Sequence, residues 1–189
     1  ENGKLESKGE VKNGSIIGKW SFYHEDGSFM THNYTTNERI NYYDNGNIEA
    51  KGKGTITDNG RKFARTGEWE IYYKNGALES EGEYSGEYTR SDLGVKIGQW
   101  RGYYESGKVK SIKNYREGEL HGEYSSYHEN GQLSNKSTYK NYNEIGESLS
   151  YHENGRKAKE LTYLNNLLNG PFYEYHKNGQ LIIEGLYNN

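Results

Sequence analysis

Residues 67–84 contain the pattern that decides the fold. They read Gly-Glu-Trp-Glu-Ile-Tyr-Tyr-Lys-Asn-Gly-Ala-Leu-Glu-Ser-Glu-Gly-Glu-Tyr. The Asn75-Gly76 pair supplies the positive φ angles that a two-residue type I′ turn requires. Aromatic and β-branched residues flank this pair, as strands prefer. The stretch therefore predicts a β-hairpin.

The same pattern recurs along the 189 residues, which indicates a repeat protein. The turn glycines recur at intervals of 19 to 31 residues, most often 24. Four positions before the turn glycine, every complete unit has tyrosine, and the next residue is always histidine or tyrosine. We expect a single repeat domain over residues 1–189, with a partial unit at 1–17 and units that begin near residues 18, 37, 67, 98, 122, 146 and 170.

Pairing across the turn predicts where the aromatic residues lie. With a two-residue turn, the His/Tyr position faces the apolar residue that follows the turn, and the Trp position faces a glycine, whose packing a large ring restores. These residues share one face, because side chains alternate along a strand. A three-residue turn would alter this register. On the other face we expect a structural ladder formed by Tyr23, Tyr42, Tyr72, Tyr103, Tyr127, Tyr151 and Tyr175.

Single hairpins cannot bury a core, but stacked hairpins can. We therefore predict an all-β fold, an elongated single antiparallel sheet of stacked β-hairpin repeats. Its terminal strands would be unpaired edges, which favour edge-to-edge self-association or a partner strand. The first residues, Glu1-Asn2-Gly3, already resemble the middle of a unit, so we expect the natural chain to start earlier. An exported and a cytoplasmic location both stay open.

Composition and motifs argue against several classes of protein. With 24 basic and 27 acidic residues, the net charge of −3 provides no basic surface for nucleic acid. The absence of cysteine excludes a disulfide scaffold, and no apolar run is long enough for membrane insertion. Catalytic motifs are absent, so we expect no enzyme activity and no cofactor. The histidines of one column, His24, His128, His152 and His176, lie on hairpins about 9–10 Å apart, too far to share a metal ion.

Residues 67–84 resemble the bacterial MORN-repeat variant, whose pattern is Gly-x-Trp-x-x-Tyr-Tyr-x-Asn-Gly-x-Leu-x-x-Glu-Gly-x-Tyr. Residues 122–139 and 170–187 match this pattern more loosely. The resemblance implies an elongated antiparallel sheet of stacked hairpins that acts as an interaction scaffold rather than a catalyst. It also implies a possible partner, because some bacterial members are antitoxins or immunity proteins paired with a toxin.

The repeat is least regular between residues 36 and 97. The connections that end at Gly67 and Gly98 hold 12 and 13 residues, where four others hold six, and the connection before Asn37 is shortened. Insertions in repeat arrays often form the binding surface. One interpretation is a basic and aromatic binding patch; the alternative is that the longer hairpins only extend the sheet. The patch residues would be Arg61, Lys62, Phe63, Arg65, Tyr88, Arg90 and Lys96.

Three hypotheses about function follow. The first is a non-enzymatic scaffold that binds another protein, as an antitoxin or immunity protein would. The second is a cell-surface protein that binds carbohydrate through its aromatic residues. The third is a structural or adhesive rod that assembles through its open edges.

Overall fold

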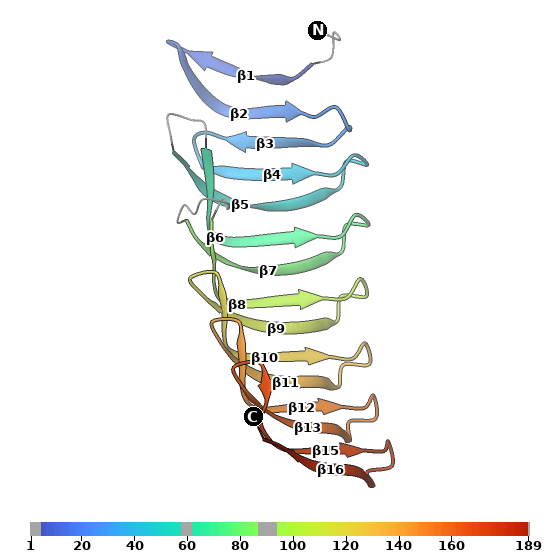
Figure 1. The fold of residues 1–189 in the computed structure, drawn as a ribbon. Coiled ribbons are helices and arrows are strands. Elements are labelled where there is room, and N and C mark those ends of the chain that lie inside the picture. Colours follow the sequence, from blue (N-terminus) through green and yellow to red (C-terminus); the bar gives the residue numbers. More distant parts are fainter. Residues whose placement is uncertain (1–4, 58–61, 87–93, 189) are drawn as a thin grey trace. The chain divides into compact units, whose positions relative to one another are not determined.

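The computed structural model describes residues 5–57, 62–86 and 94–188. They form strands and turns, and they fall into two compact units, Glu1–Val95 and Lys96–Asn189 (Figure 1). Among the described residues there is no helix that is long and apolar enough to cross a membrane. The strands of the first unit are β1 (Ser7–Lys12), β2 (Ser15–Tyr23), β3 (Phe29–Asn33), β4 (Glu38–Tyr42), β5 (Ile48–Thr57), β6 (Lys62–Tyr72) and β7 (Leu78–Ser85).

The second unit continues the hairpin pattern. Within each unit, neighbours in the chain pair antiparallel, which confirms the predicted all-β fold of stacked hairpins. The short strand β14 pairs with β13 and lies off the main strand path. The strands are β8 (Lys96–Tyr103), β9 (Val109–Arg116), β10 (Glu119–Tyr127), β11 (Leu133–Lys140), β12 (Asn143–Tyr151), β13 (Lys157–Leu164), β14 (Leu167–Leu168), β15 (Gly170–Tyr175) and β16 (Leu181–Tyr187).

The turn at Asn75-Gly76 differs from the predicted type I′ turn. The Tyr73 amide donates to the Ala77 carbonyl at 2.9 Å, and the Gly76 amide donates to the Tyr73 carbonyl at 2.8 Å. These bonds enclose a three-residue turn in which glycine has φ of 90° and forms a bulge. The Asn75 side chain accepts a hydrogen bond from the Ala77 amide, an arrangement that closes the turn with asparagine outside the positive-φ region.

Two-residue turns with two positive φ angles occur instead at the other end of the hairpins. Their central residues are Asn13-Gly14, Glu117-Gly118, Asn141-Tyr142 and Asn165-Asn166.

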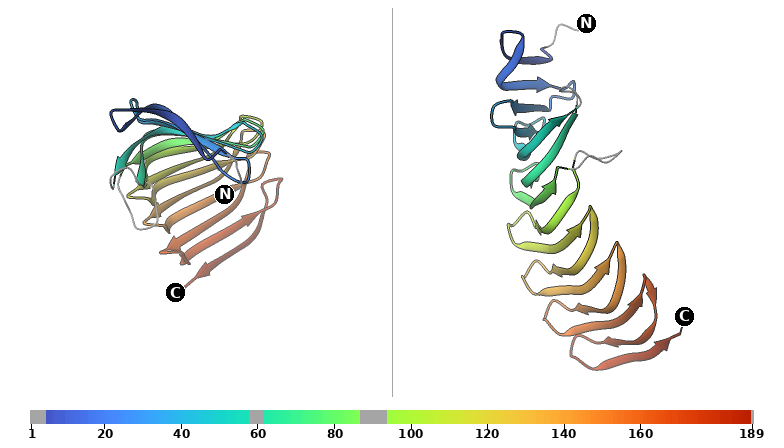
Figure 2. Two further views of the ribbon diagram at one scale, coloured as in Figure 1. Left: turned by 90° about the horizontal axis from the view of Figure 1, so that it is seen from above. Right: turned by 90° about the vertical axis from the view of Figure 1, so that its left-hand side faces the viewer.

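The bulge changes the register next to each x-Asn-Gly turn. Tyr72, rather than Tyr73, pairs with Leu78, so the prediction that the His/Tyr position faces the apolar residue is wrong. Further from the turn the predicted pairs are confirmed: Trp69 pairs with Gly82, and Tyr84 pairs with Gly67. Figure 2 shows that the strands in each unit bend along their length. Gly67 has a φ of 64°, which side chains rarely adopt. A side chain there would meet no atom within 4 Å, so this backbone conformation, and not lack of space, favours glycine.

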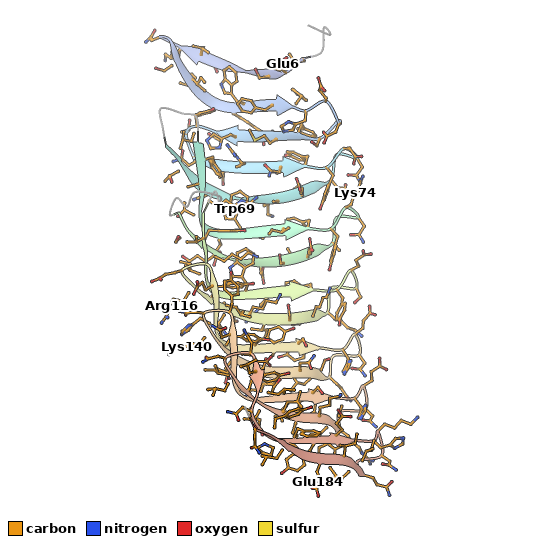
Figure 3. The ribbon with its side chains drawn as sticks, viewed as in Figure 1. Glu6, Trp69, Lys74, Arg116, Lys140 and Glu184 are labelled. Carbon is orange, nitrogen blue, oxygen red and sulfur yellow. The ribbon has the colours of Figure 1, made fainter. Side chains whose placement is uncertain are left out.

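The core of the first unit is a layer of aromatic rings over glycines. Trp69 is 1% exposed, and Figure 3 shows it on β6. A Cβ atom on Gly52 would lie 2.5 Å from the Trp69 ring. Trp20 covers Gly9, and in the second unit Phe172 covers Gly185, in the same way. Glycine is therefore required at Gly52 because the indole occupies the space of a side chain.

In four hairpins the His/Tyr position joins the hairpin to the next one in the same unit. The Tyr104 hydroxyl donates to the Tyr127 carbonyl at 2.7 Å, and Nε2 of His128 lies 2.8 Å from the Tyr151 carbonyl. Tyr43 and His152 make the same contacts in their own units. Because a carbonyl only accepts, the imidazole must donate there from Nε2. Histidine and tyrosine can replace each other in this column because each carries one donor at the required reach.

This equivalence predicts the result of two substitutions. Tyr104→Phe removes the donor to the Tyr127 carbonyl, and we expect it to lower the free energy of unfolding by about 1 kcal/mol. Tyr104→His keeps a donor and should cost clearly less. Urea unfolding of the full chain measures both. Equal losses for the two variants would show that the hydrogen bond does not explain the column.

Candidate functional site

One face of the first unit departs from the aromatic-over-glycine pattern. Across the strands, His32 pairs with Trp20 on one side and with Arg39 on the other, and Arg39 pairs with Gly52. Gly52 in turn pairs with Trp69. Arginine thus stands where other units have an aromatic residue, and histidine stands where the Trp69 hairpin has glycine.

Phe63 covers this irregular part of the row. It lies on the extension of the β5–β6 hairpin, opposite Ile56, and it is 5% exposed. Its ring centroid lies 3.6 Å from Cζ of Arg39, and it makes edge contacts with the rings of His32 at 5.3 Å and Trp69 at 6.2 Å. Gly54 allows this approach, because a side chain there would overlap the Phe63 ring.

Arg65 forms a second stacked pair beside the first. Its Cζ atom lies 4.5 Å from the Trp69 ring centroid and 5.4 Å from the Tyr84 ring centroid. Its Nη1 donates to the Tyr84 hydroxyl at 3.1 Å. We call the group formed by Arg39, Phe63, Arg65, Trp69 and Tyr84 the cationic–aromatic cluster.

The positive charge of this cluster has no acidic partner. Within the described ranges, neither Arg39 nor Arg65 has a carboxylate at ion-pair distance. Burial lowers the pKa of Arg39 to about 10, and the nearby Arg65 charge adds to this effect. His32 is 1% exposed, and burial, followed by the charge of Arg39, lowers its pKa to about 4. Four polar atoms are buried here without a hydrogen-bond partner: the two ring nitrogens of His32, Nε of Arg39 and Oδ1 of Asn41.

The residues of the predicted patch are only partly brought together. Phe63 is buried, and Arg65 lies on Trp69. Lys62 pairs with Thr57 through the backbone. Lys96 belongs to the second unit, where its Nζ lies 3.9 Å from the Trp100 ring centroid. The predicted residues Arg61, Tyr88 and Arg90 lie outside the described residues.

Arg39 and His32 were not among the predicted patch residues. A signal for Arg39 exists in the sequence, because it interrupts the Trp/Tyr column. No comparable signal identifies His32, whose place beside Arg39 depends on the register of β3 and β4.

Two members of the predicted tyrosine ladder, Tyr72 and Tyr175, make polar contacts on the opposite face. The Tyr72 hydroxyl donates to Glu70, which also forms an ion pair of 2.7 Å with Lys51. The hydrogen bonds from Lys51 and Tyr72 lower the pKa of the Glu70 carboxyl. In the second unit the Tyr175 hydroxyl donates to Glu160 of the neighbouring strand β13, and Glu160 forms an ion pair with Lys157. The structural role of the whole ladder stays a prediction.

Metal ligation finds no support in the part of the chain that the structure describes. No group of three His, Cys, Asp or Glu side chains there is arranged to hold an ion. His128 and His152 instead contact backbone carbonyls through Nε2.

Comparison with known proteins identifies the repeat. The model of the family described as "MORN repeat variant" matches residues 65–85, 96–117, 120–141, 144–165 and 168–189. The chain belongs to the MORN repeat variant family. The matched MORN segments begin at Arg65, so His32, Arg39 and Phe63 lie outside them.

Other comparisons add little to the MORN assignment. No curated protein matches the chain. One solved structure, titled "Crystal Structure of TcdB2-TccC3-Cdc42", matches 82% of this chain and 11% of its own chain, with 11% sequence identity and a TM-score of 0.20. This MORN chain therefore spans about a tenth of that protein, and the likeness carries no argument about fold or function.

Proposed function

We propose that this MORN repeat chain is a non-catalytic scaffold that binds another protein through the cationic–aromatic cluster of its first unit. The observation that carries the proposal is the pair of guanidinium groups that lie on aromatic rings and have no acidic partner among the described residues. Arginine and aromatic residues are enriched among the residues that dominate protein interfaces. The rest of the repeat supplies a rigid frame.

An antitoxin or immunity role is a narrower version of this proposal. Its support is the resemblance to bacterial MORN-repeat proteins, in which some members are paired with a toxin. The partner would then be a toxin, bound tightly and specifically.

Carbohydrate binding is the weaker alternative. Sugar stacking requires an accessible aromatic face, whereas Trp69 and Trp100 are 1% and 3% exposed. The Trp69 ring covers Gly52 and packs against Tyr84, and Nζ of Lys96 lies 3.9 Å from the Trp100 ring centroid.

Native capture from the source cells, followed by site-directed photo-cross-linking, tests the proposal. The chain contains no cysteine, so a single introduced cysteine carries the cross-linker. Met30 pairs with Asn41, two residues from Arg39 on β4, so its side chain lies on the face of the cluster. Lys53 pairs with Glu38 and lies on the opposite face. We expect one enriched protein that is cross-linked to the Met30→Cys variant and not to the Lys53→Cys variant.

Two results would contradict the proposal. One is that the intact chain enriches no protein over a bead control. The other is that the captured protein is cross-linked to the Lys53→Cys variant and not to the Met30→Cys variant.

A further inference from the structure

We infer that Arg39 and Arg65 together hold a carboxylate group, supplied by an acidic side chain or C-terminus of the bound protein. This inference rests on the proposed function for the source of the carboxylate. The site itself is a property of the chain alone and is tested without the partner.

Stacking leaves both guanidinium groups able to bind an anion. The Phe63 and Trp69 rings lie against the guanidinium groups of Arg39 and Arg65, whereas the N–H donors of a guanidinium lie in its plane. Arg65 uses one nitrogen on the Tyr84 hydroxyl. Among the described residues, the terminal nitrogens of Arg39 make no hydrogen bond, and unlike its Nε atom they reach solvent. Both side chains therefore present donors that match a planar carboxylate.

The neighbouring polar atoms provide an independent argument for a ligand. His32 is almost wholly buried, and it lies directly across the strands from Arg39 with two unpartnered ring nitrogens. Buried polar atoms in proteins are nearly always paired, and an unpaired one calls for an explanation such as strain, a bound water or ion, or a functional requirement. Several such atoms gather here around two like charges, and an anion relieves the repulsion between those charges.

The surroundings favour a carboxylate over a phosphate. The two arginines lie against the rings of Phe63, Trp69 and Tyr84. These rings offer apolar surface for the carbon atoms that carry a carboxylate. The chain has a net charge of −3, which offers no wider basic field for a polyanion. Glu38 and Glu68 are exposed, and by alternation Glu38 lies on the face opposite Arg39.

Titration of the full chain with sodium glutarate tests the site. Sodium phosphate and sodium chloride at equal ionic strength are the comparison ligands. Two readouts follow binding: the NMR signals of the arginine Nε–H groups and tryptophan fluorescence, because Arg65 lies on Trp69. We expect a saturable response to glutarate that sodium chloride does not reproduce.

Variants assign the binding to the two arginines. Arg39→Gln and Arg65→Gln should each weaken glutarate binding about tenfold or more, because each removes a charge-assisted pair. Arg39→Lys should also weaken it, because lysine keeps the charge but loses the planar fork. Arg101→Gln, at an exposed position of the second unit, removes one charge elsewhere and should leave binding unchanged. Circular dichroism on heating checks that each variant is folded.

A response to glutarate that equals the response to chloride would overturn the inference. So would binding that survives in the folded Arg39→Gln and Arg65→Gln variants, or phosphate binding as tight as glutarate binding. These outcomes leave the proposed function standing if native capture still enriches a protein. If glutarate binds but no protein is captured, the site stands and the proposed function fails.

Discussion

Replacing Trp69 with alanine is expected to lower the free energy of unfolding of the Glu1–Val95 unit by about 3–5 kcal/mol. The indole is 1% exposed, contacts Phe63, Tyr84 and Arg65, and covers Gly52. Its removal leaves a cavity that the glycine opposite cannot fill. Denaturant unfolding of the full chain, followed by near-ultraviolet circular dichroism, measures the loss.

A double-mutant cycle with Gly52 serves as the control. Gly52→Ala alone should cost about 1–3 kcal/mol, because the new methyl group meets the Trp69 ring. In the Trp69→Ala background, the same change should cost much less. Additive losses would contradict the account of the core as rings packed over glycines.

Acidification is expected to destabilise the first unit through His32. Its pKa is about 4 in the folded protein and 6.5 in the unfolded chain, because burial and Arg39 disfavour the charged ring. Below pH 6.5 the unfolded chain therefore binds a proton that the folded state excludes. The free energy of unfolding should fall by up to about 3 kcal/mol between pH 7 and pH 4, with no contribution from His32 above pH 7. Urea unfolding at a series of pH values measures this slope.

Two variants separate His32 from the other titratable groups. His32→Phe removes the ionisable ring from a site already lined by Tyr34 and Phe63, so the slope between pH 6.5 and pH 4.5 should flatten. His121→Gln, at a half-buried position of the second unit, should keep the slope of the unsubstituted chain. The pKa of the Glu70 carboxyl is lowered, so its effect appears only at more acidic pH. An unchanged slope in His32→Phe would refute the assignment.

Periodicity alone predicts the hairpins and the pairing of Trp69 with Gly82, because an aromatic ring and a glycine recur at fixed distances from the turn. It does not predict the turn type. An Asn-Gly pair fits both a two-residue turn and a three-residue turn, and the choice depends on the hydrogen bond from the Ala77 amide to Asn75. That difference of one residue places Tyr72, rather than Tyr73, opposite Leu78.

The candidate site was predicted only in outline. The unequal connections point to the part of the sequence that holds Phe63 and Arg65, two members of the cluster. They do not show that Phe63 would be buried, because that depends on how the longer β5–β6 hairpin folds over Arg39. The contact between His32 and Phe63 joins residues on strands that are not adjacent, and the sequence pattern of a single hairpin does not predict such a contact.

The most direct test of the central claim is quantitative native capture with the Arg39→Gln, Arg65→Gln double variant. The Arg101→Gln variant is captured in parallel, and mass spectrometry compares the recovered protein. We predict that the double variant, folded by circular dichroism, loses most of the bound protein, whereas Arg101→Gln retains it. Equal recovery by both variants would contradict the claim that the cationic–aromatic cluster is the binding surface.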